Sequence, residues 1–266
     1  MSHRAGAVVL ELMEHAFPDW DLRCGRPKSL SLAEAVRLTR VRLRRNETFA
    51  ELGEDFGLAG STAWEYYQQI TRQLARVLAV DLGALTESVR GKICLVDGML
   101  VTVFNWRHRH DLFSGKHRRY GMGVQVIADL HGRVLGVSRG FPGSWHDLHC
   151  FTEAGLVCLA QAAGTAVGDS GYQGSEMTTP NKKKPGLPRT ESDMAHNTAL
   201  AVLRAAVEWA NAHLKNWRIL ATRYRDSLHR FDQTITAVAG LTMLNEQHSG
   251  RPLTFTRLNK LKDVSE

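Results

Sequence analysis

Two short apolar segments of the sequence each end in an aspartate beside glycine. Residues 92–98 read Lys-Ile-Cys-Leu-Val-Asp-Gly and contain Asp97, and residues 166–174 contain Asp169 in a glycine-rich stretch. Apolar runs of this length without polar alternation predict strands that are buried on both faces. A carboxylate at the end of such a strand is costly to bury unless a cation or hydrogen-bond donors compensate its charge. Both aspartates are therefore candidate ligands of a divalent ion, although Asp97 could instead start a turn before Gly98.

A third candidate acid lies on a predicted amphipathic helix. Glu208, Asn211 and Lys215 stand at offsets 0, 3 and 7, so one helical face carries an acid, an amide and a base. Two strand-end aspartates and a helical glutamate can hold a pair of divalent ions, which would keep the attacking and leaving oxygens of a phosphodiester in line. Carboxylates favour Mg²⁺, for which Mn²⁺ substitutes. Glu191 and Asp193 are rival third acids, but a flexible loop edge holds metal geometry less well, which favours Glu208.

Five segments carry a resemblance to a known family. They are residues 96–98, 120–129, 143–147, 168–174 and 208–220. In this order the chain resembles the DDE transposases of insertion sequences and their Harbinger-like relatives, from about Leu30 to Glu246. The spacing agrees as well, since 72 residues separate Asp97 from Asp169 and 39 separate Asp169 from Glu208.

The resemblance implies a fold, an activity and partners. The fold is α/β, with a ribonuclease H-like catalytic domain after an N-terminal all-α helix-turn-helix module. The enzyme would bind mobile-element ends on double-stranded DNA, cleave phosphodiester bonds and join the 3′-OH to target DNA, with Asp97, Asp169 and Glu208 holding two Mg²⁺ ions. Cutting two ends implies at least a homodimer. Asp147 belongs to a His-Asp pair that recurs near the family's active site, in a supporting role that the resemblance leaves open.

Two other functions use the same residues. A DNA-binding protein derived from a mobile element would keep the helix-turn-helix and lose catalysis, which the intact trio of acids argues against. A metal-dependent endonuclease without strand transfer needs the same three acids. Only the reaction product, joined DNA or fragments alone, separates that endonuclease from a transposase.

The N-terminal part of the chain predicts helices. Residues 1–29 indicate a helix followed by a linker. Ser31 then caps a basic helix, residues 49–56 form a short helix, and a glycine turn leads to a third helix capped by Ser61. This layout over residues 30–88 predicts a helix-turn-helix, with a plain three-helix packing module as the alternative. The expected DNA contacts on the third helix are Ser61, Thr62, Trp64, Glu65 and Gln68 toward bases, with Arg72 and Arg76 toward phosphates.

The rest of the chain predicts the elements of a catalytic domain over residues 89–248. Strands are expected at residues 92–97, 120–129, 133–141 and 166–169, and helices from residue 146, over 193–216 and over 227–245, the last of them packed against the sheet. Three strands, a helix, a fourth strand and a further helix follow the order of a ribonuclease H-like fold. Residues 249–266 are predicted to be a basic C-terminal tail that frays.

Basic residues accompany the acidic positions along the chain. Those expected to contact DNA phosphates are Arg107, Arg109, Lys116, Arg118 and Arg119 in a hairpin, and Lys182, Lys183 and Lys184 in a loop between the second and third acids. Their charge would give an affinity for DNA that falls steeply with salt. Solvated loops are the alternative for both segments. Lys215 could neutralise a phosphate next to the metal ions.

Composition narrows the class of protein. The 266 residues, 43% of them apolar, suit one large domain and a small one. A net charge of +7 and a pI near 9.4 favour a polyanionic partner. Four cysteines without a CxxC pair indicate a reducing compartment. The sequence contains no apolar run of about 18 residues and no signal-peptide pattern, so a cytoplasmic, nucleoid-associated protein without membrane contact is expected.

Overall fold

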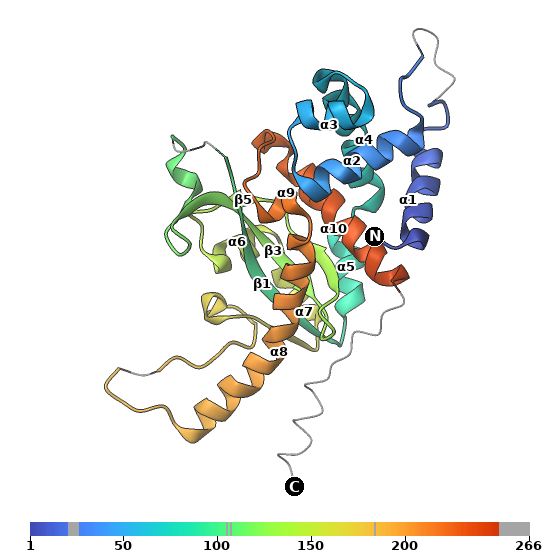
Figure 1. Cartoon of the computed structure of the whole chain (residues 1–266). Helices are drawn as coiled ribbons and strands as arrows, with labels where there is room; N and C mark the ends of the chain where they lie inside the picture. Colours follow the sequence, from blue (N-terminus) through green and yellow to red (C-terminus); the bar gives the residue numbers. More distant parts are fainter. Residues whose placement is uncertain (21–26, 105, 107, 184, 250–266) are drawn as a thin grey trace.

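The computed structural model describes residues 1–20, 27–104, 106, 108–183 and 185–249. Two expected DNA contacts, Arg107 and Lys184, lie outside the described residues, as does the predicted tail from residue 250 onward. The described chain forms a mixed sheet that carries helices on both faces, with further helices gathered beside it (Figure 1).

Helices occupy the first third of the chain. They are α1 (His3–Ala16), α2 (Leu32–Arg45), α3 (Phe49–Phe56), α4 (Gly60–Leu78) and α5 (Leu82–Val89). Capping boxes start α2 and α3, because the hydroxyls of Ser31 and Thr48 accept hydrogen bonds from backbone N–H groups three residues on. Gly57 ends α3 in the left-handed conformation, with φ at 66°. The three helices predicted between residues 30 and 88 are present, and α5 follows them.

The start of α4 differs from the prediction. The helix begins at Gly60 with Ala59 as its N-cap, so the prediction that Ser61 caps it is wrong. A Cβ on Gly60 would lie 3.1 Å from the backbone oxygen of Phe49. The glycine therefore lets α4 begin close against the start of α3, one residue before the serine.

The position of Gln68 also corrects a prediction. This side chain was expected to face DNA, yet it is 9% exposed. Gln68 shares a helical face with Thr71 and Ala75, at offsets of three and seven, and both of these are buried. The packing of α4 against α2, α3 and the last helix of the chain covers this face, so Gln68 does not reach a nucleic acid from here.

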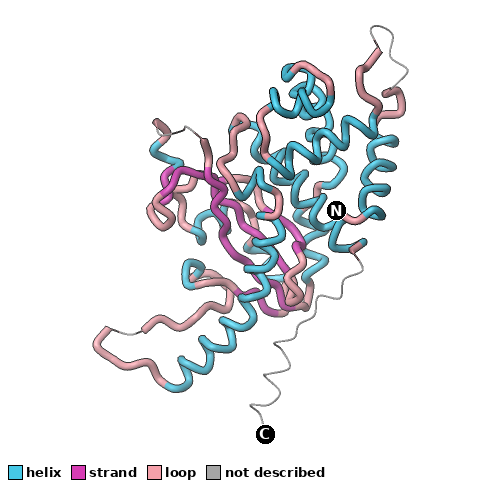
Figure 2. Tube along the Cα trace, viewed as in Figure 1, coloured by secondary structure: helices cyan, strands magenta, loops and turns pink. Residues whose placement is uncertain are grey.

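The sheet is built around two long antiparallel strands. These are β1 (Ile93–Thr102) and β3 (Arg119–Ala128), and the shorter strands are β2 (Phe113–Ser114), β4 (Val134–Val137), β5 (Phe141–Pro142) and β6 (Thr165–Val167). β2, β4 and β5 each pair with β3 in antiparallel orientation, while β6 pairs with β1 in parallel orientation. Strands form at all four predicted places, with two corrections. Asp97 does not end its strand, because β1 continues five residues beyond it. The strand predicted at residues 133–141 is divided into β4 and β5. Figure 2 shows the strands together at the centre of the part of the chain that follows α5.

Helices cover both faces of this sheet. The helices that follow β1 in the chain are α6 (Asp147–Glu153), α7 (Val157–Ala162), α8 (Glu191–Lys215), α9 (Arg218–Ala221) and α10 (Phe231–His248). Short 3₁₀ turns lie at His110–Leu112, Ser170–Tyr172 and Leu228–Arg230. Leu95 packs in one core cluster with residues of α8, such as Val207. Cys94 and Val96 point the other way, into a second cluster with residues of α6 and α7. The alternation along β1 thus gives the sheet two buried faces, as the unbroken apolar run predicts.

The last helix joins the two parts of the chain. The prediction packed it against the sheet, and α10 does contact β4, but it also packs extensively along α4. One hydrophobic cluster consequently runs from Val9 through Ile70 to Leu95 and Leu241. The N-terminal helices and the sheet therefore share a continuous core.

Two further features bear on the expectations from composition. None of the helices in the described ranges combines the length and the apolarity needed to cross a membrane. The cysteines within those ranges, Cys94, Cys150 and Cys158, are free thiols.

Candidate active site

The sheet brings Asp97 and Asp169 to the same edge. Leu95 of β1 and Val167 of β6 are paired in parallel register, and each aspartate follows its paired residue by two positions. Side chains two positions apart along a strand leave the same face. Just past the end of β6, the Asp169 carboxylate accepts a hydrogen bond of 2.7 Å from the backbone N–H of Gly171, which fixes the turn that presents it.

Asp147 approaches these two aspartates from the helix on the other face. It is the first residue of α6. Glycines make room for it: a Cβ on Gly98 would collide with its carboxylate, and a Cβ on Gly171 would lie 3.1 Å from its Oδ2 atom and 2.8 Å from Oδ1 of Asp169. Gly98 after Asp97 and Gly171 after Asp169 thus leave room for the carboxylate of Asp147 beside the other two acids.

Lys116 lies among these acids. Its ammonium group donates a hydrogen bond of 3.0 Å to Oδ2 of Asp147 and lies 3.8 Å from Oδ2 of Asp169. Burial lowers the pKa of Lys116, but the hydrogen bond to Asp147 and the charges of Asp169 and Asp97 outweigh burial, so its pKa is raised. Lys116 was predicted to contact a DNA phosphate, but in this structure its positive charge compensates the acids Asp147 and Asp169.

Asp97 occupies the most buried position of the three. Burial raises its pKa to about 6, and the neighbouring charges of Asp169 and Asp147 push in the same direction, while Arg204 and Lys116 oppose the rise. The amide of Asn211 donates a 2.8 Å hydrogen bond to Oδ2 of Asp97. Asp97 is thus a carboxyl group whose negative charge needs a nearby cation.

One face of α8 covers Asp97. Arg204, Glu208, Asn211 and Lys215 stand at offsets 0, 4, 7 and 11, which places them on a single stripe of the helix. Arg204 lies 4.0 Å from Oδ1 of Asp97 and Asn211 hydrogen-bonds its other oxygen, so the exposed Glu208 lies on the stripe between two residues that reach Asp97. Sequence reasoning missed Arg204, although its position four residues before Glu208 on the same face was available.

The rival third acids lie far from this stripe. Glu191 and Asp193 belong to the first turn of α8, where the hydroxyl of Thr190 caps the helix by accepting from the backbone N–H of Asp193. At a rise of about 1.5 Å per residue, Glu191 lies roughly 25 Å along the helix from Glu208. That end of α8 projects away from the sheet (Figure 1), so neither rival adjoins Asp97 or Asp169.

The oxygen donors of the site suit a hard divalent ion. Asp97, Asp147 and Asp169 offer carboxylates, and Oδ1 of Asn211 is buried without a hydrogen-bond partner in the described part of the chain. Mg²⁺ prefers donors of this kind. Over the described ranges, no three carboxylate, imidazole or thiol groups already converge closely enough to hold an ion. The donor set fits the metal, and Lys116 would have to move aside from the carboxylates to admit it.

The remaining predicted DNA contacts lie on the surface of the described chain. Ser61, Arg72, Arg76, Arg109, Arg118, Arg119, Lys182, Lys183 and Lys215 are exposed and Thr62 is half-buried. The guanidinium of Arg109 already makes two hydrogen bonds to Asp111, of 2.8 and 2.7 Å. Arg118 and Arg119 line a cavity of about 570 Å³ together with Arg223. The charge of Arg109 is therefore neutralised locally, while Arg118 and Arg119, at the start of β3, have no ion pair with any other described residue.

Comparisons with known proteins agree with this arrangement. The family described as "DDE superfamily endonuclease" matches residues 96–243, a segment that contains Asp97, Asp147, Asp169 and Glu208. The curated protein named "Putative transposase for insertion sequence element IS112", from Streptomyces albus G, is 29% identical over 228 residues, which cover 84% of this chain and 83% of that protein. No solved structure matches the chain significantly. Because the family match spans more than half of the residues and includes all the acids gathered at the sheet edge, the chain belongs to the DDE superfamily endonucleases.

Proposed function

We propose that the protein is a DNA transposase that binds the ends of its mobile element, cleaves phosphodiester bonds there and joins the freed 3′-OH to target DNA. The observation that carries the proposal is the gathering of Asp97, Asp147 and Asp169 under the Glu208 stripe of α8. The similarity to the relative named as an insertion-sequence transposase supports the same function. A ribonuclease H-like topology for the mixed sheet, and the Harbinger-like branch of the family, are parts of this proposal.

The residues of the site divide the work in the following way. Asp97, Asp169 and Glu208 would hold two Mg²⁺ ions, which when bound supply activation of the attacking water or 3′-OH and stabilisation of the leaving oxygen. Asn211 keeps the Asp97 carboxylate oriented through its amide. Lys116 compensates the charges of Asp147 and Asp169, and its ammonium would be free to contact a phosphate once metal ions take over that compensation.

DNA recognition is assigned to the helices that precede the sheet. In the proposal α3 and α4 act as a helix-turn-helix, with Ser61 and Thr62 near base edges and Arg72 and Arg76 along the phosphates. The exposure of the two arginines supports this assignment. The buried Gln68 is no longer part of it. Action on two element ends requires at least two copies of the chain.

The experiment that tests the function compares substitutions of acids on the same fold. The substrate is DNA that carries the gene with its flanking sequence, incubated with Mg²⁺ or Mn²⁺. Asp97→Asn and Glu208→Gln should each lower the cleavage rate by at least about a hundredfold, because each removes a charged metal ligand. Glu191→Gln, a matched change at the far end of α8, should cleave like the wild type.

The products distinguish the candidate functions. Joined DNA supports the transposase, fragments alone indicate an endonuclease without strand transfer, and DNA binding without cleavage indicates a protein that has lost catalysis. A wild-type cleavage rate in Asp97→Asn would contradict the assignment of the site. If Glu208→Gln retained activity and Asp147→Asn lost it, the third ligand would be Asp147.

A further inference from the structure

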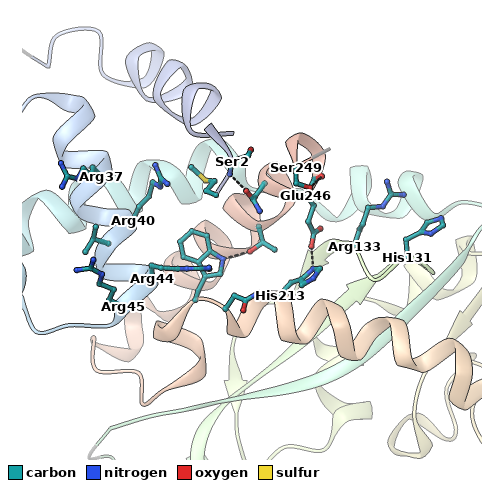
Figure 3. A pocket seen from close by; sticks show the side chains of 16 residues that line it. Ser2, Arg37, Arg40, Arg44, Arg45, His131, Arg133, His213, Glu246 and Ser249 are labelled. Carbon is teal, nitrogen blue, oxygen red and sulfur yellow. Dashed lines mark hydrogen bonds and ion pairs between the residues drawn. The ribbon is translucent and has the colours of Figure 1, made fainter. Parts of the chain in front are cut away.

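A groove on the other side of α8 is lined by basic residues. Its volume is about 1320 Å³. Arg37, Arg40 and Arg44 of α2 form one wall, the turn between β3 and β4 with Arg133 forms the other, and the seam between α8 and α10 forms the floor (Figure 3). The groove contains none of the acids of the active site.

The arginines of α2 are arranged as a row. Arg37, Arg40 and Arg44 stand at offsets 0, 3 and 7, so they share one face of the helix and span about 10 Å along it. Among the ion pairs of the described residues, none involves these three side chains. Half-buried Arg40 has its pKa lowered by burial. Arg44 is held over the ring of Trp217, 5.4 Å from its centroid, which keeps its guanidinium at the groove.

The acid in the groove does not neutralise this row. Glu246 accepts hydrogen bonds from His213 at 2.8 Å and from the backbone N–H of Val134 at 3.1 Å. The other basic side chains of the lining are compensated, since Arg133 pairs with Asp129 at 2.6 Å and Arg45 lies 3.4 Å from Glu47. Arg37 lies 5.4 Å from the centre of the Phe56 ring, and after the hydrogen bonds from Ser31 its charge helps to lower the pKa of Glu34 on the same helix. Over the described residues, positive charge without an ion pair is thus concentrated on α2, most clearly at Arg40 and Arg44.

The groove is separated from the active site by the body of α8. His213 lies nine residues after Arg204, which is two and a half turns at about 3.6 residues per turn, and therefore on the opposite face of the helix. Arg204 and Asn211 reach Asp97 from one face, while His213 and Asn216 line the groove from the other. Anything bound in the groove cannot be the segment that the carboxylates contact.

We propose that this groove is a second DNA-binding site that holds one sugar-phosphate backbone of a duplex, apart from the segment that is cut. The inference rests on the proposed function for the choice of DNA as the polyanion. Rigid guanidinium forks suit phosphates, and a row of them without base-reading geometry contacts the backbone of any sequence. Trp217, the aromatic residue of the lining, is 6% exposed and donates to Thr242, so the groove lacks the stacking platform that single strands use.

The test measures binding of the full-length chain to a labelled duplex of unrelated sequence by fluorescence anisotropy. EDTA is present throughout, so that metal-dependent contacts do not contribute, and salt is varied. Arg37→Gln with Arg44→Gln should weaken binding roughly tenfold at ~0.1 M salt and reduce the slope of log affinity against log salt by about two. The corresponding double change to lysine should restore most of the affinity, because it keeps both charges.

A control removes the same charge elsewhere. Arg90→Gln with Lys92→Gln alters two exposed residues at the end of α5 and the start of the sheet, outside the groove, and should change affinity less than twofold. An equal loss in the control would overturn the proposal, because net charge would then explain the effect. Unchanged duplex binding in the groove variant would also overturn the proposal. So would a groove variant that loses affinity for single-stranded RNA but not for duplex DNA.

The result is separable from the fate of the proposed function. If the groove variant binds duplex like the wild type while the wild type cleaves and joins DNA, the groove inference fails and the transposase proposal stands. If the groove variant loses duplex binding while no form of the chain cleaves DNA, the proposed activity fails and the groove remains a DNA-binding site. Circular dichroism and the melting temperature of each variant exclude unfolding as the cause.

Discussion

The carboxyl group of Asp97 lies where burial opposes its negative charge. Its side chain is 18% exposed, and its pKa is raised from 3.8 to about 6, chiefly by burial and then by Asp169 and Asp147. A raised pKa in an acid means that the folded state binds the proton more tightly than the unfolded chain. The destabilising contribution of Asp97 is therefore absent at low pH, grows as pH rises from about 4 to 6, and is fully present above pH 6.

Replacing Asp97 by asparagine should consequently stabilise the metal-free protein at neutral pH. Asparagine keeps an acceptor oxygen for Asn211 and removes the charge. We expect Asp97→Asn to unfold with a free energy roughly 2 to 3 kcal/mol above that of the wild type at pH 7, from about two pKa units at 1.36 kcal/mol each, and the difference to shrink toward pH 4. Urea unfolding at several pH values, in EDTA, measures it.

Asp111 provides a control of opposite sign. Hydrogen bonding from Arg109 lowers the pKa of this exposed acid, so its ionised form is the stabilising one. Asp111→Asn should leave the free energy of unfolding unchanged or slightly lower at pH 7. The prediction for Asp97 would be wrong if Asp97→Asn lowered the free energy of unfolding at pH 7 by as much as Asp111→Asn does. The charged form of Asp97 would then not be destabilising in the folded protein.

Sequence reasoning could single out candidate acids but not the contacts around them. Asp97, Asp169 and Glu208 stand out because a charge directly after a buried apolar run, or at the edge of an apolar helix stripe, contradicts the local pattern. The pairing of Lys116 with Asp147 spans 31 residues, and the contact of Asn211 with Asp97 spans 114. Such contacts depend on which faces the fold brings together, and no local pattern encodes them.

At the scale of elements, the close approach of α4 and α10 depends on one glycine. A Cβ on Gly240 would collide with the Cβ of Leu78 and would lie 3.1 Å from the Leu78 backbone oxygen. The backbones of helices that cross this closely lie almost in contact. Adding a methyl group at the crossing point would therefore force one helix away from the other. The helix that closes the catalytic part is thus fitted to the helix that is proposed to read DNA.

Gly240→Ala should therefore destabilise the protein despite the better helix propensity of alanine. The expected loss is about 1 to 3 kcal/mol from overpacking. Gly6→Ala in α1 is the matched control, because the nearest atoms to its Cβ would be 3.7 and 3.8 Å away, and alanine there should raise stability by up to about 1 kcal/mol. Thermal melts of both variants suffice, and equal shifts of the same sign would contradict the role of the close crossing.

The element boundaries show where local sequence stops being informative. The start of α3 was predictable from Thr48 and Glu51, since the capping box is local chemistry. The start of α4 at Gly60 was not, because it depends on how near Phe49 lies in the fold. In the same way, the burial of Gln68 depends on the packing of α4 against α2, α3 and α10, and α10 begins more than 160 residues later in the chain.

At the scale of the whole molecule, a buried polar network ties the N-terminal helices to the segment after α9. Arg42 pairs with Asp226 at 2.6 Å, and their side chains are only 2% and 7% exposed. The hydroxyl of Tyr67 donates to the other Asp226 oxygen at 2.7 Å, and Asn46 donates to Thr222 at 2.7 Å and to the Arg223 carbonyl at 3.0 Å. Together with the continuous hydrophobic cluster, the network couples the predicted module of residues 30–88 to the catalytic part.

This coupling predicts that the chain unfolds as one cooperative unit and that Arg42 is critical for it. Arg42→Met leaves Asp226 as a buried charge without its cation, which should cost about 3 to 5 kcal/mol. Arg42→Met with Asp226→Leu should recover a substantial part, because no uncompensated charge remains. Urea unfolding followed by both circular dichroism and tryptophan fluorescence would give coincident transitions. Two separate transitions in the wild type would mean instead that the helices and the sheet fold independently, so that DNA held by one need not be positioned for the other. Additive losses in the double variant would mean that Arg42 and Asp226 are not energetically coupled.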